Sequence, residues 1–161
     1  MLVALLILAL GETGAAALSQ LRPAIQRWAA ARVDVNAKAH GFSGSAEYDG
    51  EVRARAVYTA EAGLSFFHTH AEGLGLVLFV ASTLVASAVP RRRTRAALYV
   101  LLTAGGLFPL GYAVYGAAVL ELGRDAGIEL AERWVLTPLG SAAILGLLGL
   151  AGALAAARSR A

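Results

Sequence analysis

Four long apolar stretches, separated by short polar breaks, dominate the pattern of the chain. They cover about residues 2–20, 64–89, 96–120 and 135–157. Each is long enough to cross a hydrocarbon core, which needs ~20 apolar residues in a helix. The pattern predicts an all-α fold: an integral membrane four-helix bundle that forms a single domain over residues 1–161.

The polar segments between these stretches predict the connections. Residues 22–62, about 40 in all, carry alternating charges and Gly/Ser turns, and we expect an outer-face loop region with a short surface helix at most. The segment ELGRDAGIELAERW, before the fourth stretch, predicts a short interfacial helix. Within the third stretch, Pro109 lacks the N–H that would bond the carbonyl of Gly105. We therefore expect a distortion there that opens space beside Tyr112.

The distribution of arginines predicts the orientation. Arg91, Arg92, Arg93, Arg95, Arg158 and Arg160 form two clusters without acids, whereas the opposite segments carry eight Lys/Arg and nine Asp/Glu. Basic residues in short loops stay on the cytoplasmic side. We expect a multi-pass protein of a bacterial-type inner membrane with both termini in the cytoplasm. The competing interpretation of residues 1–20 is a secretory signal peptide, but no basic segment precedes the apolar run and Glu12 interrupts it.

The composition excludes several functional classes. Hydrophobic residues make up 58% of the chain and charged residues 16%, which opposes a water-soluble enzyme. The net charge of +3 comes from short arginine clusters beside apolar runs, so we expect no nucleic-acid partner. The chain has no cysteine, and its single methionine is Met1. A metal site would therefore have to use histidine, carboxylate or tyrosine.

The polar residues inside the apolar stretches gather toward one side. The cytoplasmic halves of the second and third stretches contain no acidic residue, basic residue or histidine, so a pathway through the membrane is not visible. An ionisable group within a spanning helix is a candidate functional residue, because its burial in lipid is costly. We expect a pocket that opens to the outer face and is built from Glu12, His68, His70 and Glu72, with Tyr112 and Tyr115 as supporting polar residues.

The motif FFHTHAEGLG allows two kinds of cofactor site. His68 and Glu72 share a helix face, whereas His70 points almost oppositely. If the helix frays, His68, His70 and Glu72 with His40 from the outer segment suit Zn²⁺, Cu²⁺ or Fe²⁺. If the helix is regular, one histidine faces the bundle as a candidate axial ligand of haem b. Each residue also has a structural alternative. The histidines could contact lipid head groups, and Glu72 could be a solvated residue at a helix start. The tyrosines could belong to an aromatic belt at the membrane interface.

The string HTHAEGLGLVLF resembles the start of a helix in the catalytic subunits of haem-copper oxidases and nitric oxide reductases. In those subunits a histidine in this context is an axial haem ligand, and the resemblance implies that role for His68 or His70. The match covers about 25 residues, and no histidine follows His70. The resemblance therefore implies a shortened relative or a small companion of such complexes.

We arrive at two functional hypotheses. The first is a small inner-membrane protein with a metal or haem site near its outer face, linked to respiratory electron transfer, in which Glu12 tunes the site or accepts a proton. The second is a non-catalytic accessory or assembly subunit that packs against other membrane subunits or forms a homo-oligomer. The small residues Ala142, Gly146, Gly149 and Ala153 would let helices approach closely in either case.

Overall fold

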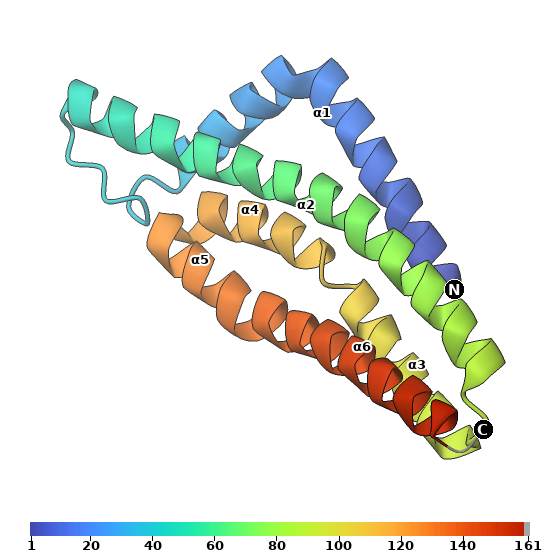
Figure 1. Cartoon of the computed structure of the whole chain (residues 1–161). Helices are drawn as coiled ribbons and strands as arrows, with labels where there is room; N and C mark the ends of the chain where they lie inside the picture. Colours follow the sequence, from blue (N-terminus) through green and yellow to red (C-terminus); the bar gives the residue numbers. More distant parts are fainter. Residues whose placement is uncertain (160–161) are drawn as a thin grey trace.

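The computed structural model describes residues 1–159, in which every regular element is helical. The elements are α1 (Leu2–Val35), α2 (Ala46–Ala88), α3 (Arg92–Gly106), α4 (Leu110–Leu122), α5 (Arg124–Ala131), the π-helical turn η1 (Glu132–Leu136) and α6 (Thr137–Arg158). Helices α3 and α4 form one interrupted rod, and α5, η1 and α6 form another (Figure 1). The four rods are long and apolar enough to cross a membrane. The prediction of an all-α fold with four long helices is confirmed.

The rods lie in a row rather than in a closed square (Figure 1). Helix α1 packs along α2, α2 packs on α4, and the α5–α6 rod packs on α3 and α4. The ammonium group of Met1 lies 3.5 Å from Oγ of Ser82, near the C-terminal end of α2. The end of α6 lies at this same end of the molecule (Figure 1). Both ends of the described chain therefore lie at one end of the molecule, as an even number of antiparallel rods requires.

The outer segment differs from the expected loop over residues 22–62. Helix α1 continues to Val35 and α2 begins at Ala46, so only residues 36–45 form a loop. The reason is tertiary burial, because Val33 of α1, Ala56 of α2 and Val119 of α4 pack into one core. The 43 residues of α2 extend ~64 Å, about twice the ~30 Å of a hydrocarbon core. The short helix expected before the fourth stretch is present as α5, but it continues through η1 into α6 without a break.

Helix α1 bends in its middle (Figure 1), where Pro23 removes a backbone donor. The carboxylate of Glu61 accepts hydrogen bonds from Nε of Arg22, at 3.3 Å, and from Nε2 of Gln26, at 2.9 Å. These bonds tie α2 to both sides of the bend. Below the bend, a cleft of about 420 Å³ lies between the two helices, and its lining includes Arg22, Glu61 and His68.

The predicted distortion of the third rod is confirmed, because α3 ends at Gly106 and α4 begins at Leu110. The N–H of Phe108 bonds the carbonyl of Gly105 at 3.0 Å, a tighter turn than an α-helix makes. The expected open space beside Tyr112 is filled instead. The rings of Phe66, His70 and Phe108 lie 5.5, 4.7 and 5.5 Å from the Tyr112 ring, between centroids.

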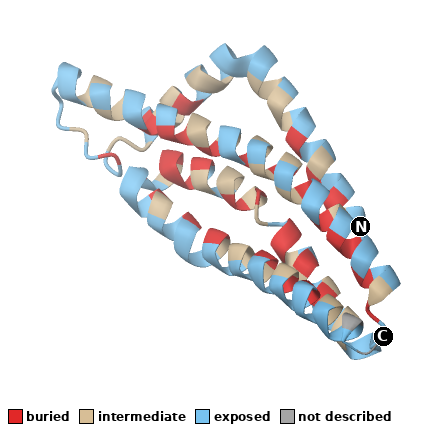
Figure 2. Ribbon diagram, in the orientation of Figure 1, coloured by how far each residue is buried: buried red, intermediate tan, exposed pale blue. Residues whose placement is uncertain are grey.

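Small residues bring α3 and α6 close together, as expected. A Cβ atom added at Gly105 would lie 2.5 Å from Cα of Ala143. Gly146 and Gly149 face the side chains of Leu102 and Leu98, whose Cδ2 atoms would lie 2.9 and 3.0 Å from an added Cβ. The buried residues follow these contacts between rods, while the outward faces are exposed (Figure 2). In a bilayer, such exposed apolar faces would contact lipid or other apolar helices.

Candidate functional site

The two histidines of the HTH motif lie on different faces of one regular helix. Helix α2 is continuous from Ala46 to Ala88. His68 contacts α1 through the carbonyl of Gly11, and His70 packs against Tyr112 of α4. The frayed arrangement, which would bring both imidazoles to one ion, is not found in this structure.

Three polar side chains come together where α1 packs against the side of α2 that carries His68. We call them the Glu12–His68–Glu72 cluster. Nδ1 of His68 lies 3.2 Å from the carbonyl oxygen of Gly11, and Nε2 lies 3.7 Å from Oε1 of Glu72. The carboxyl groups of Glu12 and Glu72 lie close enough to interact with each other. A bond to a carbonyl oxygen requires the proton on Nδ1, so the lone pair of neutral His68 is on Nε2, beside the carboxylate.

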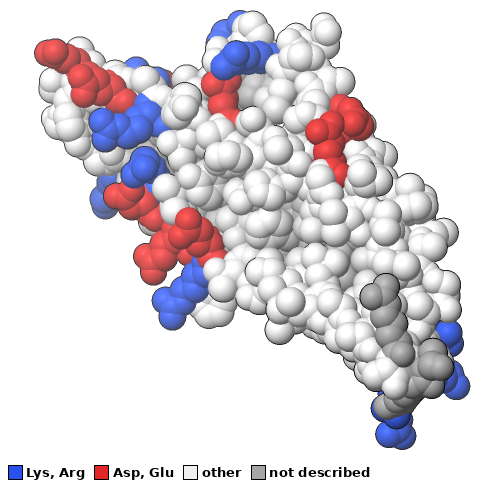
Figure 3. Space-filling model, viewed as in Figure 1, with Lys and Arg blue, Asp and Glu red and all other residues white. Residues whose placement is uncertain are grey.

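The charges around this cluster are negative. The space-filling view shows an uncharged band between two charged ends, broken by one acidic patch (Figure 3). Glu12 and Glu72 are the acidic residues that lie within the apolar stretches 2–20 and 64–89. In the described part of the chain, no Lys or Arg forms an ion pair with either residue. Two carboxylates in contact repel each other unless a proton or a cation lies between them.

The cluster is open enough to change its arrangement. The side chains of His68 and Glu72 are 28% and 41% exposed. Among residues 1–159, no three His, Asp or Glu side chains are already arranged to hold a metal ion. A cation bound here would therefore require the two glutamates to rotate toward Nε2 of His68.

His70 belongs to an aromatic cluster. Its Nδ1 lies 2.8 Å from the carbonyl oxygen of Phe66 in its own helix, and its ring is 5.6 Å from Phe108 and 4.7 Å from Tyr112, between centroids. Tyr115 is the next aromatic neighbour of Tyr112, at 6.5 Å. A porphyrin coordinated by His70 would have to displace these rings. The packing of His70 therefore does not fit a haem ligand as it stands.

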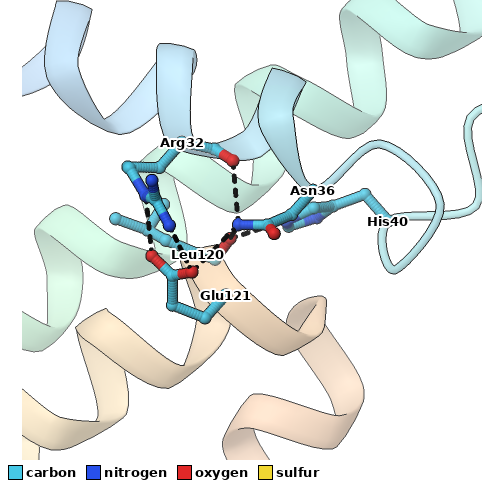
Figure 4. Close-up of polar contacts among 5 residues, drawn as sticks. All are labelled: Arg32, Asn36, His40, Leu120 and Glu121. Carbon is cyan, nitrogen blue, oxygen red and sulfur yellow. Dashed lines mark hydrogen bonds and ion pairs between the residues drawn. The ribbon is translucent and has the colours of Figure 1, made fainter.

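His40 lies in a separate network at the far end of the molecule from the termini (Figure 4). Its Nε2 lies 3.1 Å from the carbonyl oxygen of Leu120, which also accepts a hydrogen bond from Asn36 at 3.2 Å. Arg32 donates two hydrogen bonds to the carboxylate of Glu121, at 2.8 and 2.6 Å. These contacts attach the end of α1 to the end of α4 and satisfy a carbonyl that the helix leaves free.

The loop position of His40, beside the early part of α2, separates it from the other histidines. His40 lines a pocket with Ala56, twelve residues before His68, which is ~18 Å along a helix. The structure does not bring His40 to His68 or Glu72. The network around it lies outside the apolar stretches, and there the guanidinium of Arg32 lowers the pKa of the Glu121 carboxyl.

Sequence reasoning missed the polar residues that hold together the end of the molecule remote from the termini. Arg32 and Asn36 are four residues apart, which places them on one helix face, and Glu121 directly follows an apolar stretch. This spacing is a signal for a polar face. It does not identify the partner, because that depends on how α1 packs against α4.

Comparisons with protein-family models, with curated proteins and with solved structures gave no match.

Proposed function

We propose that the chain is a four-pass protein of a bacterial-type inner membrane, with both termini in the cytoplasm, that binds a divalent metal ion at the Glu12–His68–Glu72 cluster. The observation that carries the proposal is the meeting of two carboxylates and one oriented imidazole from two helices. His68 is held by Gly11, so its metal-binding nitrogen faces the carboxylates. A hydrogen bond from the other ring nitrogen commonly orients metal-binding histidines.

The depth of the cluster supports access from the outer side. Glu72 precedes Ala88 by 16 residues, or ~24 Å along the helix. Counted from the arginine turn after α2, this depth is near the outer boundary of a ~30 Å hydrocarbon core. Long acidic side chains at this depth reach the interface, where ions and water are present.

The chemistry of the donor set selects the class of ion. One imidazole nitrogen and two carboxylates suit Zn²⁺ or Fe²⁺, and these donors include no thiolate or thioether that would favour Cu(I). A divalent cation also compensates the two carboxylates, which have no Lys or Arg partner in the described structure. His68, Glu72 and Glu12 would be its ligands, whereas His40 and His70 would have structural roles.

Zinc binding to the purified full chain in detergent tests the proposal. After removal of metals by a chelator, isothermal titration with Zn²⁺ should show one ion per chain. His68→Ala should weaken binding at least ~100-fold, because loss of a ligand exceeds the ~10–100-fold effect of an outer-shell change. The double variant Glu12→Gln, Glu72→Gln should do the same with little change of shape.

Two controls and the pH dependence distinguish the site from surface binding. His70→Ala and Tyr115→Phe should leave the affinity unchanged, because neither side chain contacts the cluster. Zinc affinity should fall as the pH falls through the histidine range near ~6.5, since imidazole binds metal in its neutral form. An absence of zinc binding, or full binding by His68→Ala, would contradict the metal site and leave the accessory-subunit hypothesis. A haem absorption band in protein isolated from cells would contradict the proposal that the ligand is a metal ion without a porphyrin.

A further inference from the structure

A second polar pocket, which we call the outer pocket, lies at the end of the molecule remote from the termini. Its volume is about 300 Å³. Three segments line it, namely the turn after α1, the first turns of α2 and the start of α5. The polar side chains in its lining are His40, Tyr48, Arg55, Arg124 and Asp125. It shares no residue with the Glu12–His68–Glu72 cluster.

The arginines give the outer pocket a positive charge. Arg55 is exposed and forms no ion pair in the part of the chain that the structure describes. Arg124 bonds the carboxylate of its neighbour Asp125 at 2.8 Å, through one of its nitrogens. Asp125 is itself 91% exposed, and such surface pairs are weak. Two guanidinium groups therefore face one pocket with a single acid among the lining residues.

A buried histidine adds a polar group to the same wall. His40 is 9% exposed, and its Nε2 is used by the carbonyl of Leu120. The described structure provides no hydrogen-bond partner for Nδ1 of this ring. Tyr48, near the start of α2, is a further polar residue of the lining.

The backbone at the start of α5, like the arginines, favours an anion in the outer pocket. Gly123 has a φ of +85°, and this turn sets the first residues of α5 into the lining of the pocket. The first N–H groups of a helix have no partner within the helix and attract anions. The helix start therefore reinforces the arginines.

The distance of the outer pocket from the membrane indicates whether its ligand comes from the lipid or from the aqueous phase. Arg55 precedes Ala88 by 33 residues, or ~50 Å along α2. This is ~20 Å beyond a ~30 Å hydrocarbon core, so the outer pocket lies beyond the lipid head groups.

We propose that the outer pocket binds a small oxyanion from the aqueous phase, a carboxylate or phosphate group, with Arg55 as its principal contact. Planar guanidinium groups bind both kinds of oxyanion through paired hydrogen bonds. The volume is at the lower end of the range for small-molecule sites, which fits a small solute. The hydroxyl group of Tyr48 would donate a hydrogen bond to a remaining oxygen.

Isothermal titration of the full chain in detergent with inorganic phosphate and, separately, with succinate tests this proposal. At least one of the two should bind with one site per chain. Arg55→Gln should weaken that binding about tenfold or more, as expected for loss of a charged hydrogen bond. The matched control is Arg27→Gln, which removes the same charge from an exposed position outside the pocket and should change the affinity less than ~2-fold.

Further variants keep the test decisive. If Arg55→Gln is unstable, Arg55→Lys retains the charge and should still weaken binding, because an ammonium group cannot form the paired contact. His68→Ala should leave oxyanion binding unchanged, which separates this site from the proposed metal site. Failure of both anions to bind at 10 mM would overturn the proposal. Equal losses in Arg55→Gln and Arg27→Gln would also overturn it, because they would indicate a diffuse charge effect. Binding only to vesicles containing phosphatidylglycerol would contradict the aqueous source.

Discussion

The contact of α3 with α6 leads to a quantitative prediction for Gly105→Ala. An added Cβ at this position would lie 2.5 Å from Cα, 2.6 Å from the nitrogen and 2.7 Å from Cβ of Ala143. Ordinary contacts between such atoms are 3.4–4 Å. Two of the three neighbours are backbone atoms, which cannot rotate away. The helices would have to separate by about 1 Å, which disturbs the interdigitation of Leu102 and Gly146.

The size of the effect follows from two opposing contributions. Overpacking a closely packed interior destabilises by ~1–3 kcal/mol. The higher helix propensity of alanine opposes this by up to ~1 kcal/mol. We expect Gly105→Ala to lower the free energy of unfolding by ~1–2 kcal/mol. At ~2–4 °C per kcal/mol, the thermal midpoint should fall by several degrees.

Thermal unfolding of the purified chain in one detergent, followed by circular dichroism, measures this difference. The matched control is Gly152→Ala on α6, where an added Cβ would meet no atom within 4 Å. This variant should be as stable as the wild type or more stable. Ala143→Gly, combined with Gly105→Ala, should restore only part of the loss, since it removes one of the three close contacts.

Equal stability of Gly105→Ala and Gly152→Ala would refute the inferred packing of α3 against α6. Full rescue by Ala143→Gly would show that the close approach involves side chains alone. Either result would mean that the two rods are farther apart than the structure has them.

The remaining predictions concern orientation, acid sensitivity and the turn before α5. A cysteine introduced at Ser43 should react with a membrane-impermeant reagent only from the outer side, and one at Thr94 only from the cytoplasmic side; the reverse pattern would overturn the proposed orientation. Because Arg32 lowers the pKa of Glu121 in the folded chain, the stability from this pair is present at neutral pH and is lost as the pH falls through the lowered pKa. Thermal midpoints measured from pH 7 down to pH 3 should therefore fall more in the wild type than in Arg32→Ala, and parallel curves would contradict the pairing. Gly123→Ala should destabilise the outer end by ~1 kcal/mol or more, because its φ is +85° and an added Cβ would collide with the carbonyl of Ala39; unchanged unfolding would contradict this turn.

Local chemistry explains why several features could be predicted from the sequence. Long apolar runs with few charges leave little alternative to helices. The break after Gly106 follows from Pro109, since a missing N–H and a steric clash act on the neighbouring turn alone. The opposite directions of His68 and His70 follow from the helical period as soon as α2 is regular.

The candidate site was predicted in part. The sequence placed Glu12 and the HTH motif in parts of two apolar stretches that we expected on one side, and the structure brings Glu12 to His68 and Glu72. It could not predict that His70 turns into an aromatic cluster. Nor could it predict that His40 lies beside Ala56, ~18 Å along α2 from His68, because that depends on where α1 ends.

The sequence alone determined that this chain is helical, apolar along four rods, and polar within those rods mainly toward one end. Only the tertiary structure decided how far α1 and α2 extend beyond the apolar stretches, and which polar groups meet. The physical reason is that residues 22–62 have a weak local preference, and their helices form because Val33, Ala56 and Val119 bury one another across three rods. The contacts of Glu12 with Glu72 and of Arg32 with Glu121 depend on the same long-range packing.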